Sequence, residues 1–400
     1  MSLHPIANAE KYLKMEKKKV LIIANLSGFI WKFELEDIKL LQELGYEVHC
    51  ASNVYDRGYY FDPEEMASKE IVFHPVEMAR SPYMYQMNKK ALRQLITIID
   101  RENISLIHCH TPVGGMLGRL AAKKSHGKPK VIYTAHGFHF YKGAPLFNNI
   151  VFRFAEHTLA HWTDALLVIN EEDYVAAKKM HLRKNGKVYK LPGTGLDLDF
   201  FLPASKKERQ LARKKLNISE ETFFILSVGE LNLNKNHKTA ILALQELCKD
   251  DLKEEALLYG ICGEGYFLDD IKKFAEESFI SDKIRFFGYQ REIREFYAAA
   301  DLTLFPSIRE GLGMAGLESM AMGIPVIAAD NRGTREYMVD GQNGYIFPPT
   351  DEKACQKAIL KYRALAEAEK KKMSACCLES VRGFSKENTR KIMKKVYTSL

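Results

Sequence analysis

The chain has 400 residues, of which 46% are apolar and 28% charged, and its formal net charge is +8. This composition excludes a low-complexity or disordered chain and is sufficient for two domains of roughly 170–200 residues. No run of about 18 apolar residues occurs, so no transmembrane helix is predicted. The mild positive charge is compatible with an anionic substrate, a membrane surface or nucleic acid, and it selects none of them.

The first residues of the chain and the pattern of its cysteines indicate the cellular compartment of the protein. Residues 1–14 lack the apolar segment of a signal peptide, and we expect the first domain to begin at residue 15. The seven cysteines are odd in number and scattered, with no spacing typical of zinc ligands. We therefore predict free thiols and a cytoplasmic location.

A strand–helix–strand unit is predicted at the start of the first domain. Residues 20–24 form a continuous apolar run, as in a parallel strand covered on both faces. Apolar side chains then recur at helical spacing over residues 33–44, Gly45 ends that helix, and a second strand begins at Val48. Gly28 follows the first strand, where a glycine either lets a ligand approach the helix start or serves a packing turn.

An amphipathic helix is predicted over residues 88–101. Its apolar stripe is what a helix covering a sheet requires. Lys89, Lys90 and Arg93 form a basic cluster beside the stripe. A solvated face explains this cluster, and contact with anionic lipid is the alternative.

Histidines follow two further predicted strands. His108 and His110 end the strand that begins at Ile104, and their spacing points both side chains the same way. No third ligand accompanies them in the sequence, so we do not expect a metal there. His136 follows the strand at residues 131–134, at the edge where open α/β sheets bind ligands.

The most informative stretch runs from residue 305 to 323. An apolar strand over residues 302–305 is followed by a loop containing Gly311 and by a helix that begins near Gly313. The start of that helix provides unpaired N–H groups and a partial positive charge, which suit a phosphate. Two carboxylates, Glu310 and Glu318, lie on either side of the turn. Packing glycines and surface glutamates, or a glycosidase pair, are the alternatives for these residues.

The length of this pattern favours the phosphate reading. From residue 301 to 349, including residues 323–328 and 343–347, the sequence closely resembles the donor-binding half of family 4 glycosyltransferases. These are retaining, metal-independent enzymes of the GT-B fold, and the resemblance covers nearly the whole chain. It implies an α/β protein of two doubly wound, Rossmann-like domains facing across a cleft.

The resemblance also implies domain boundaries. An N-terminal acceptor-binding domain would cover residues 15–190 and an interdomain linker residues 191–220. A nucleotide-sugar-binding domain would cover residues 221–384. The last helix, residues 385–400, would pack back onto the first domain.

The resemblance assigns roles to individual residues. Lys235 and the N–H groups near Gly313, Met314 and Ala315 would stabilise the leaving diphosphate. Glu310 would hold hydroxyls of the donor sugar, and Glu318 those of the ribose. His136 would position the sugar ring, and His136, Lys235 and Glu310 form the expected catalytic set. Tyr289 lies in the turn that passes the nucleotide base in this family, and Gly28 and Gly311 would give the donor room.

One position departs from the family. Glu230 stands near the place where many relatives carry an arginine that meets the diphosphate. At roughly 6 Å and an effective dielectric of about 20, each like-charge contact would cost about 3 kcal/mol. We therefore expect Glu230 to turn away or to bind a cation or a hydroxyl. Arg309, Arg332 or Arg335 would then serve the diphosphate, unless these arginines form surface salt bridges.

The expected reaction is retaining transfer of a glycosyl group from a nucleotide sugar, with UDP favoured over GDP. The acceptor would be a hydroxyl of a lipid-linked or free oligosaccharide in bacterial surface polysaccharide synthesis, at the inner face of the plasma membrane. We expect no metal, no cofactor and no nucleic acid partner. Asp197 and Asp199, although spaced as in metal-dependent glycosyltransferases, are interpreted as a turn. The alternatives are an epimerase or phosphorylase of the same fold and a non-enzymatic basic binding module.

Overall fold

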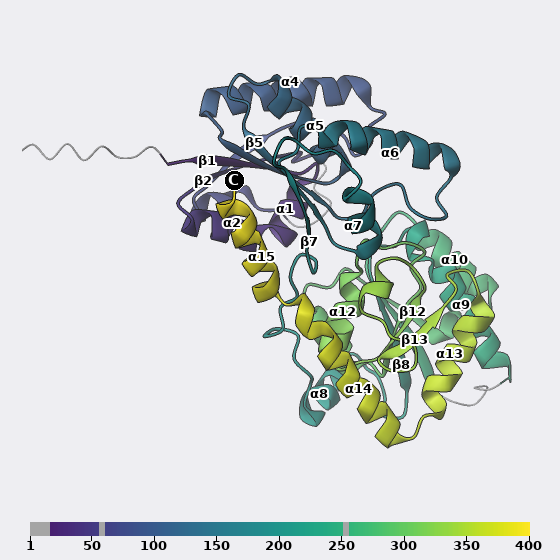
Figure 1. Ribbon diagram of the computed structural model, residues 1–400. Helices are drawn as coiled ribbons and strands as arrows, with labels where there is room; N and C mark the ends of the chain where they lie inside the picture. Colours follow the sequence, from purple (N-terminus) through teal and green to yellow (C-terminus); the bar gives the residue numbers. More distant parts are fainter. Residues whose placement is uncertain (1–16, 56–60, 251–255) are drawn as a thin grey trace, which may run out of the picture. The chain divides into compact units, whose positions relative to one another are not determined.

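The computed structural model describes residues 17–55, 61–250 and 256–400 (Figure 1). The expected start of the first domain at residue 15 lies outside these residues. The described chain forms two compact units. The first comprises residues up to Tyr133 together with Trp162–Asp164, and the second comprises Thr134–His161 and Ala165–Leu400.

The strands form two sheets that follow one another along the chain. The seven-stranded sheet has the order β3-β2-β1-β4-β5-β6-β7, and β1 pairs in parallel with both β2 and β4. Its strands are β1 Lys19–Ile23, β2 Glu47–Ser52, β3 Ile71–Pro75, β4 Leu106–His110, β5 Lys130–Ala135, β6 Ala165–Val168 and β7 Lys187–Lys190. The intervening helices are α1 Ser27–Phe33, α2 Leu35–Glu43, α3 Pro63–Ser68, α4 Tyr85–Glu102, α5 Pro112–Lys124, α6 Leu146–Ala160 and α7 Glu171–Ala177.

The predicted strand–helix–strand start is confirmed with one correction. The helix expected over residues 33–44 is α2, Leu35–Glu43, and a separate helix that the sequence did not indicate, α1, precedes it and ends before Glu34. The Glu34 side chain is buried, and one of its oxygens lies 3.2 Å from Nδ1 of His110. Gly45 follows α2 with a φ of +85°, as expected for a helix-ending glycine.

The six-stranded sheet has the order β10-β9-β8-β11-β12-β13 and is parallel throughout. Its strands are β8 Phe223–Val228, β9 Leu257–Cys262, β10 Ile284–Gly288, β11 Leu302–Phe305, β12 Val326–Ala329 and β13 Gly344–Phe347. The helices are α8 Lys206–Lys215, α9 His237–Asp250, α10 Leu268–Glu277, α11 Ile293–Ala299, α12 Met314–Ala321, α13 Glu352–Ala364, α14 Glu367–Val381 and α15 Lys386–Thr398. Short 3₁₀ turns are η1 Leu233–Lys235, η2 Ser281–Lys283, η3 Thr334–Glu336 and η4 Arg382–Phe384.

Helices cover both faces of this second sheet (Figure 1). Ile225 of β8 belongs to a core shared with α9, α10 and α13. Its neighbours Phe224 and Leu226 belong to a core shared with α8 and α11. Alternate residues of one strand thus meet helices on opposite sides, which is the doubly wound arrangement that buried parallel strands require.

The charged segment 206–215, within the expected linker, forms the regular helix α8. Ser205 and Glu208 make a capping box at its start. Arg213 is fully buried and pairs with Asp301 at 2.6 Å, which ties α8 to the residue preceding β11.

Candidate active site

The predicted strand, loop and helix at residues 302–321 are confirmed as β11 and α12. Gly313 is the N-cap of α12 with a φ of +92°, a conformation that favours glycine. A Cβ at Gly311 would collide with the carbonyl oxygen of His136, and a Cβ at Gly313 would lie 2.8 Å from the Phe305 ring. Close backbone packing therefore requires both glycines.

The start of α12 is left open to an anion. Gly313 has no side chain to cap the helix, and the first turn carries no acidic residue. The N–H groups of Met314 and Ala315 belong to this first turn, where intrahelical partners are absent. Unpaired N–H groups of this kind, together with the helix dipole, favour the binding of an anion such as a phosphate group.

Lys235 and Glu310 form an ion pair beside this helix start. Lys235 Nζ lies 2.6 Å from Glu310 Oε1, and the two side chains are only 19% and 15% exposed. Asn232 caps the turn η1 that presents Lys235. Asn234 donates to the carbonyl of Arg309, so this turn is fastened to the loop that carries Glu310. Two residues 75 positions apart in the sequence are thereby held as one unit.

Glu318 lies one turn into α12 and is held by a buried tyrosine. The Tyr297 hydroxyl is 3.1 Å from Glu318 Oε2 and 3.0 Å from the carbonyl oxygen of Ala315. Burial, with the Glu318 charge beside it, raises the pKa of Tyr297 well above its usual value. Tyr297 therefore stays protonated and can orient Glu318 as a hydrogen-bond donor.

His136 directly follows β5 and belongs to the same compact unit as α12. Desolvation lowers its pKa to about 4, so the imidazole is neutral at pH 7. A neutral ring can donate from one nitrogen and accept at the other, which suits contact with sugar hydroxyls better than with phosphate. Its backbone carbonyl packs against Gly311, as described above.

The three candidate arginines have different surroundings. Arg332 is buried, with Nη1 2.6 Å from Asp173 Oδ1 and Nη2 2.7 Å from the carbonyl oxygen of Phe138. Arg335 is largely exposed and pairs with Asp330 at 2.6 Å. Among the described residues no carboxylate lies within ion-pair distance of Arg309, whose guanidinium lies 5.2 Å from the centre of the Tyr141 ring. Arg309 is thus the member of the set available to a ligand.

Three further residues were singled out in the sequence, namely Glu230, Tyr289 and Gly28. Glu230 is exposed. Tyr289 follows β10 and is about half exposed. Gly28 is buried as the second residue of α1, in the first unit.

The expected basic cluster lies on α4 of the first unit. Lys89, Lys90 and Arg93 are all exposed, and Lys90 forms an ion pair with Glu77 at 2.5 Å. The predicted stripe consisted of Leu92, Leu95, Ile96 and Ile99. Leu95 and Ile99 are buried and Leu92 and Ile96 are partly buried, while Ile98, outside the predicted stripe, is buried as well.

Sequence reasoning missed two buried polar groups. Asp173 accepts from the backbone N–H of Phe138 and from the Asn170 side chain, which also donates to the carbonyl of Gly311. Asn170 caps α7 through its side chain, and an asparagine before three acidic residues was the available signal.

In the first unit, Glu34, Asp37 and His108 place ligand-type atoms within 4.8 Å of one another. The sequence had shown no such group beside the histidines. Burial raises the pKa of Glu34 well above its usual value, which favours the neutral carboxyl. A hydrogen-bonded pair with His110 accounts for this burial.

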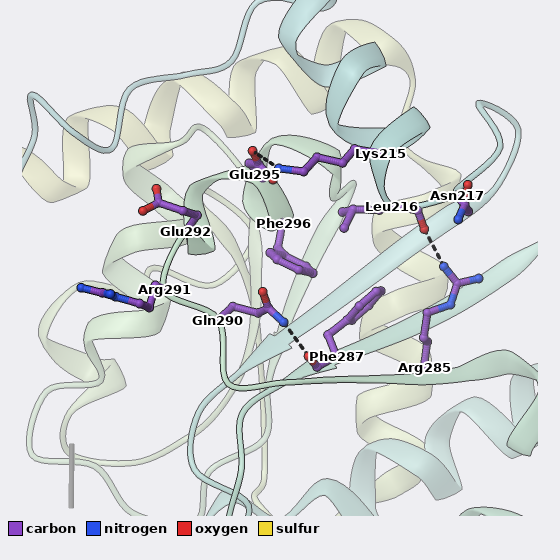
Figure 2. Close-up of a pocket in the computed structure, with 10 residues that line it drawn as sticks. All are labelled: Lys215, Leu216, Asn217, Arg285, Phe287, Gln290, Arg291, Glu292, Glu295 and Phe296. Atoms are coloured by element: carbon purple, nitrogen blue, oxygen red, sulfur yellow. Dashed lines mark hydrogen bonds and ion pairs between the residues drawn. The ribbon is translucent and has the colours of Figure 1, made fainter. Parts of the chain in front are cut away.

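A hollow of about 710 Å³ lies among α8, β10 and α11 (Figure 2). Its lining includes none of the predicted donor residues. Lys215 pairs with Glu295, Arg285 donates to the carbonyl of Leu216, and Gln290 donates to that of Phe287. These polar groups satisfy one another, and we assign the hollow no role in donor binding.

Comparisons with known proteins identify the family. Residues 208–374 match the model of glycosyl transferases group 1, and residues 19–170 match a glycosyl transferase 4-like model. EpsD of Bacillus subtilis (strain 168), a glycosyltransferase by name, is 39% identical over 344 residues, 86% of each chain. The chain belongs to the group 1 glycosyltransferases.

Further relatives of this glycosyltransferase include a UDP-Gal:alpha-D-GlcNAc-diphosphoundecaprenol alpha-1,3-galactosyltransferase of Escherichia coli. It is 26% identical over 264 residues, which cover 66% of this chain and 67% of that protein. Among solved structures, Anabaena Alr3699/HepE in complex with UDP and glucose has a TM-score of 0.76 at 15% identity, covering 96% of this chain and 100% of that one. This likeness shows that the fold is GT-B.

Proposed function

We propose that this glycosyltransferase moves a sugar from a nucleotide-sugar donor, a UDP-sugar in the first instance, to a hydroxyl of a lipid-linked or oligosaccharide acceptor. The transfer retains the anomeric configuration, needs no metal and serves bacterial surface polysaccharide synthesis. The observation that carries the proposal is the Lys235–Glu310 pair beside the uncapped start of α12. It combines a cation and free N–H groups for a diphosphate with a carboxylate for hydroxyls.

Each group has a distinct task in this proposal. As the bond between the anomeric carbon and the diphosphate breaks, negative charge grows on the departing oxygens. Lys235 and the first-turn N–H groups of α12 offset that charge without needing to reorganise. Glu310 holds hydroxyls of the transferred sugar, and neutral His136 positions its ring. Glu318, oriented by Tyr297, accepts hydrogen bonds from the ribose hydroxyls.

The printed names of relatives support the choice of substrates. The Escherichia coli relative is named for a UDP-linked donor and a diphosphoundecaprenol-linked acceptor. A lipid-linked acceptor requires work at a membrane, and no described helix is long and apolar enough to span one. We propose peripheral association with the inner face of the plasma membrane, with Lys89, Lys90 and Arg93 meeting anionic lipid. Each such cation contributes about 1 kcal/mol, so salt weakens this contact.

A thermal-shift panel of nucleotide sugars tests the donor. UDP-sugars should raise the melting temperature more than GDP-sugars, and the Glu318→Ala variant should lose that shift. Radiolabelled transfer with the stabilising donor, followed by determination of the anomeric linkage, tests retention. An inverted linkage, or no stabilisation by any nucleotide sugar, contradicts the proposal.

A further inference from the structure

Helix α6 exposes an apolar face. Its side chains Leu146, Phe147, Ile150, Val151 and Phe154 are between 36% and 77% exposed. At 100° per residue these five positions fall within an arc of about 140°. A helix of a soluble protein ordinarily turns such an arc toward the core.

The opposite side of this helix faces the protein, and its buried residues are Leu159 and Ala160. Asn149 accepts from the backbone N–H of Tyr141 and donates to the carbonyls of Tyr141 and Ala144. Phe152, on the same side as Asn149, packs against the His139 ring at 5.2 Å. The orientation of α6 is therefore fixed by inward contacts, and its apolar face points outward because of them.

The charges beside this face select among possible occupants. Lys142 and Arg153 are exposed next to it, whereas Glu156, the one acidic residue of α6, falls on the inward side of the helix with Asn149 and Phe152. A second copy of the chain meeting this face symmetrically would bring like charges together. An anionic lipid surface instead offers opposite charge to the cations and hydrocarbon to the apolar arc.

We propose that α6 lies in the plane of an anionic bilayer with its apolar face inserted at the boundary between headgroups and acyl chains. The inference deepens the proposed function, since it rests on a membrane-borne acceptor. It differs from the attraction at Lys89, Lys90 and Arg93 because insertion of apolar side chains resists salt.

Co-sedimentation with phosphatidylglycerol vesicles tests the insertion at roughly 0.1 M and 0.5 M salt, where the screening lengths differ by about twofold. The parent protein should keep a substantial part of its binding at the higher salt. The Phe147→Ser/Phe154→Ser variant should lose at least about tenfold in partition coefficient, because two apolar side chains no longer leave water. The matched control is Phe279→Ser, since Phe279 is 89% exposed in the turn after α10.

Two results would overturn the inference. One is equal high-salt partitioning of the parent and the double variant. The other is a lipid-free dimer of the parent that the double variant abolishes, which would make a second copy the occupant. UDP-induced thermal stabilisation, measured on the same samples, reports on the donor site independently. Loss of vesicle binding with that stabilisation intact separates this inference from the proposed function.

Discussion

Replacing Glu310 by glutamine should tighten the binding of UDP and at the same time lower kcat/KM for sugar transfer. Lys235 Nζ lies 2.6 Å from Glu310 Oε1. A phosphate oxygen bound to the other side of that ammonium would lie roughly 5–6 Å from the carboxylate, given hydrogen bonds of about 2.8 Å. At an effective dielectric of about 20, repulsion between one carboxylate and one phosphate charge is then about 3 kcal/mol.

Removing that repulsion should tighten UDP binding. Solvent screening reduces the full figure, so we expect Glu310→Gln to bind UDP about tenfold to a hundredfold more tightly. The same change removes a charged hydrogen bond to the donor sugar, worth about 1.5–3 kcal/mol, and should lower kcat/KM by about 10- to 150-fold. Lys235→Met, by contrast, should weaken UDP binding and lower turnover together.

Isothermal titration with UDP and steady-state transfer with the nucleotide sugar measure the two quantities. Glu295→Gln is the matched control, because Glu295 pairs with Lys215 at the same 2.6 Å but in an exposed position. Neither quantity should change more than about twofold there, since exposed ion pairs contribute little. Weaker UDP binding by Glu310→Gln would refute the reasoning, because it would place Glu310 away from the diphosphate.

Three further predictions concern neighbouring groups. Glu318→Ala should weaken UDP binding by about tenfold or more. EDTA should leave the activity of the parent enzyme unchanged. Activity that is lost on chelation and restored by manganese would contradict the metal-free mechanism. Arg309→Ala should lower donor kcat/KM by about tenfold and Arg335→Ala by less than twofold, and near-normal kinetics of Arg309→Ala would exclude it as the compensating cation. Arg332→Ala should cost about 3–5 kcal/mol of stability by leaving Asp173 buried and unpaired, whereas Arg335→Ala should barely lower the melting temperature. Burial already raises the pKa of Asp173, so protonation favours the folded state and the Arg332→Ala deficit should shrink from pH 7 to pH 5; a growing deficit contradicts this.

The parts of the fold that were predictable depend on neighbours in sequence. The strand at 302–305 and the helix after Gly313 follow from an apolar run, a glycine turn and helical spacing, all within twenty residues. The break at Glu34 and the helix at 206–215 were not predicted. Glu34 is buried against His110, a partner distant in sequence. The helix at 206–215 did have a local signal, the Ser205–Glu208 capping box, which the interpretation of this segment as a linker left unused.

The same limit applies to the candidate site. Lys235, Glu310 and Glu318 were recognisable by motif, but the Lys235–Glu310 pair joins two loops that a linear pattern does not relate. Arg332 and Asp173 are 159 residues apart, and only the structure shows that they neutralise one another in a buried place. In α6, likewise, the inward contacts of Asn149 with residues outside the helix decide which face is exposed.

These contacts bear on how a chain with Glu230 can hold a diphosphate at all. The Arg332 guanidinium is buried, its charge is paired with Asp173, and it also donates to the carbonyls of Phe138 and Glu310, so Arg332 holds the loop of Glu310 in place and its charge is already neutralised. Arg309 immediately precedes Glu310, and its backbone carbonyl is fixed by Asn234 while its side chain has no carboxylate partner among the described residues. To replace the arginine that relatives carry near the position of Glu230, a cation must be held beside the diphosphate and must not be neutralised by a carboxylate. We therefore propose that Arg309 supplies the compensating charge and that Arg332 helps to position the loop that carries it.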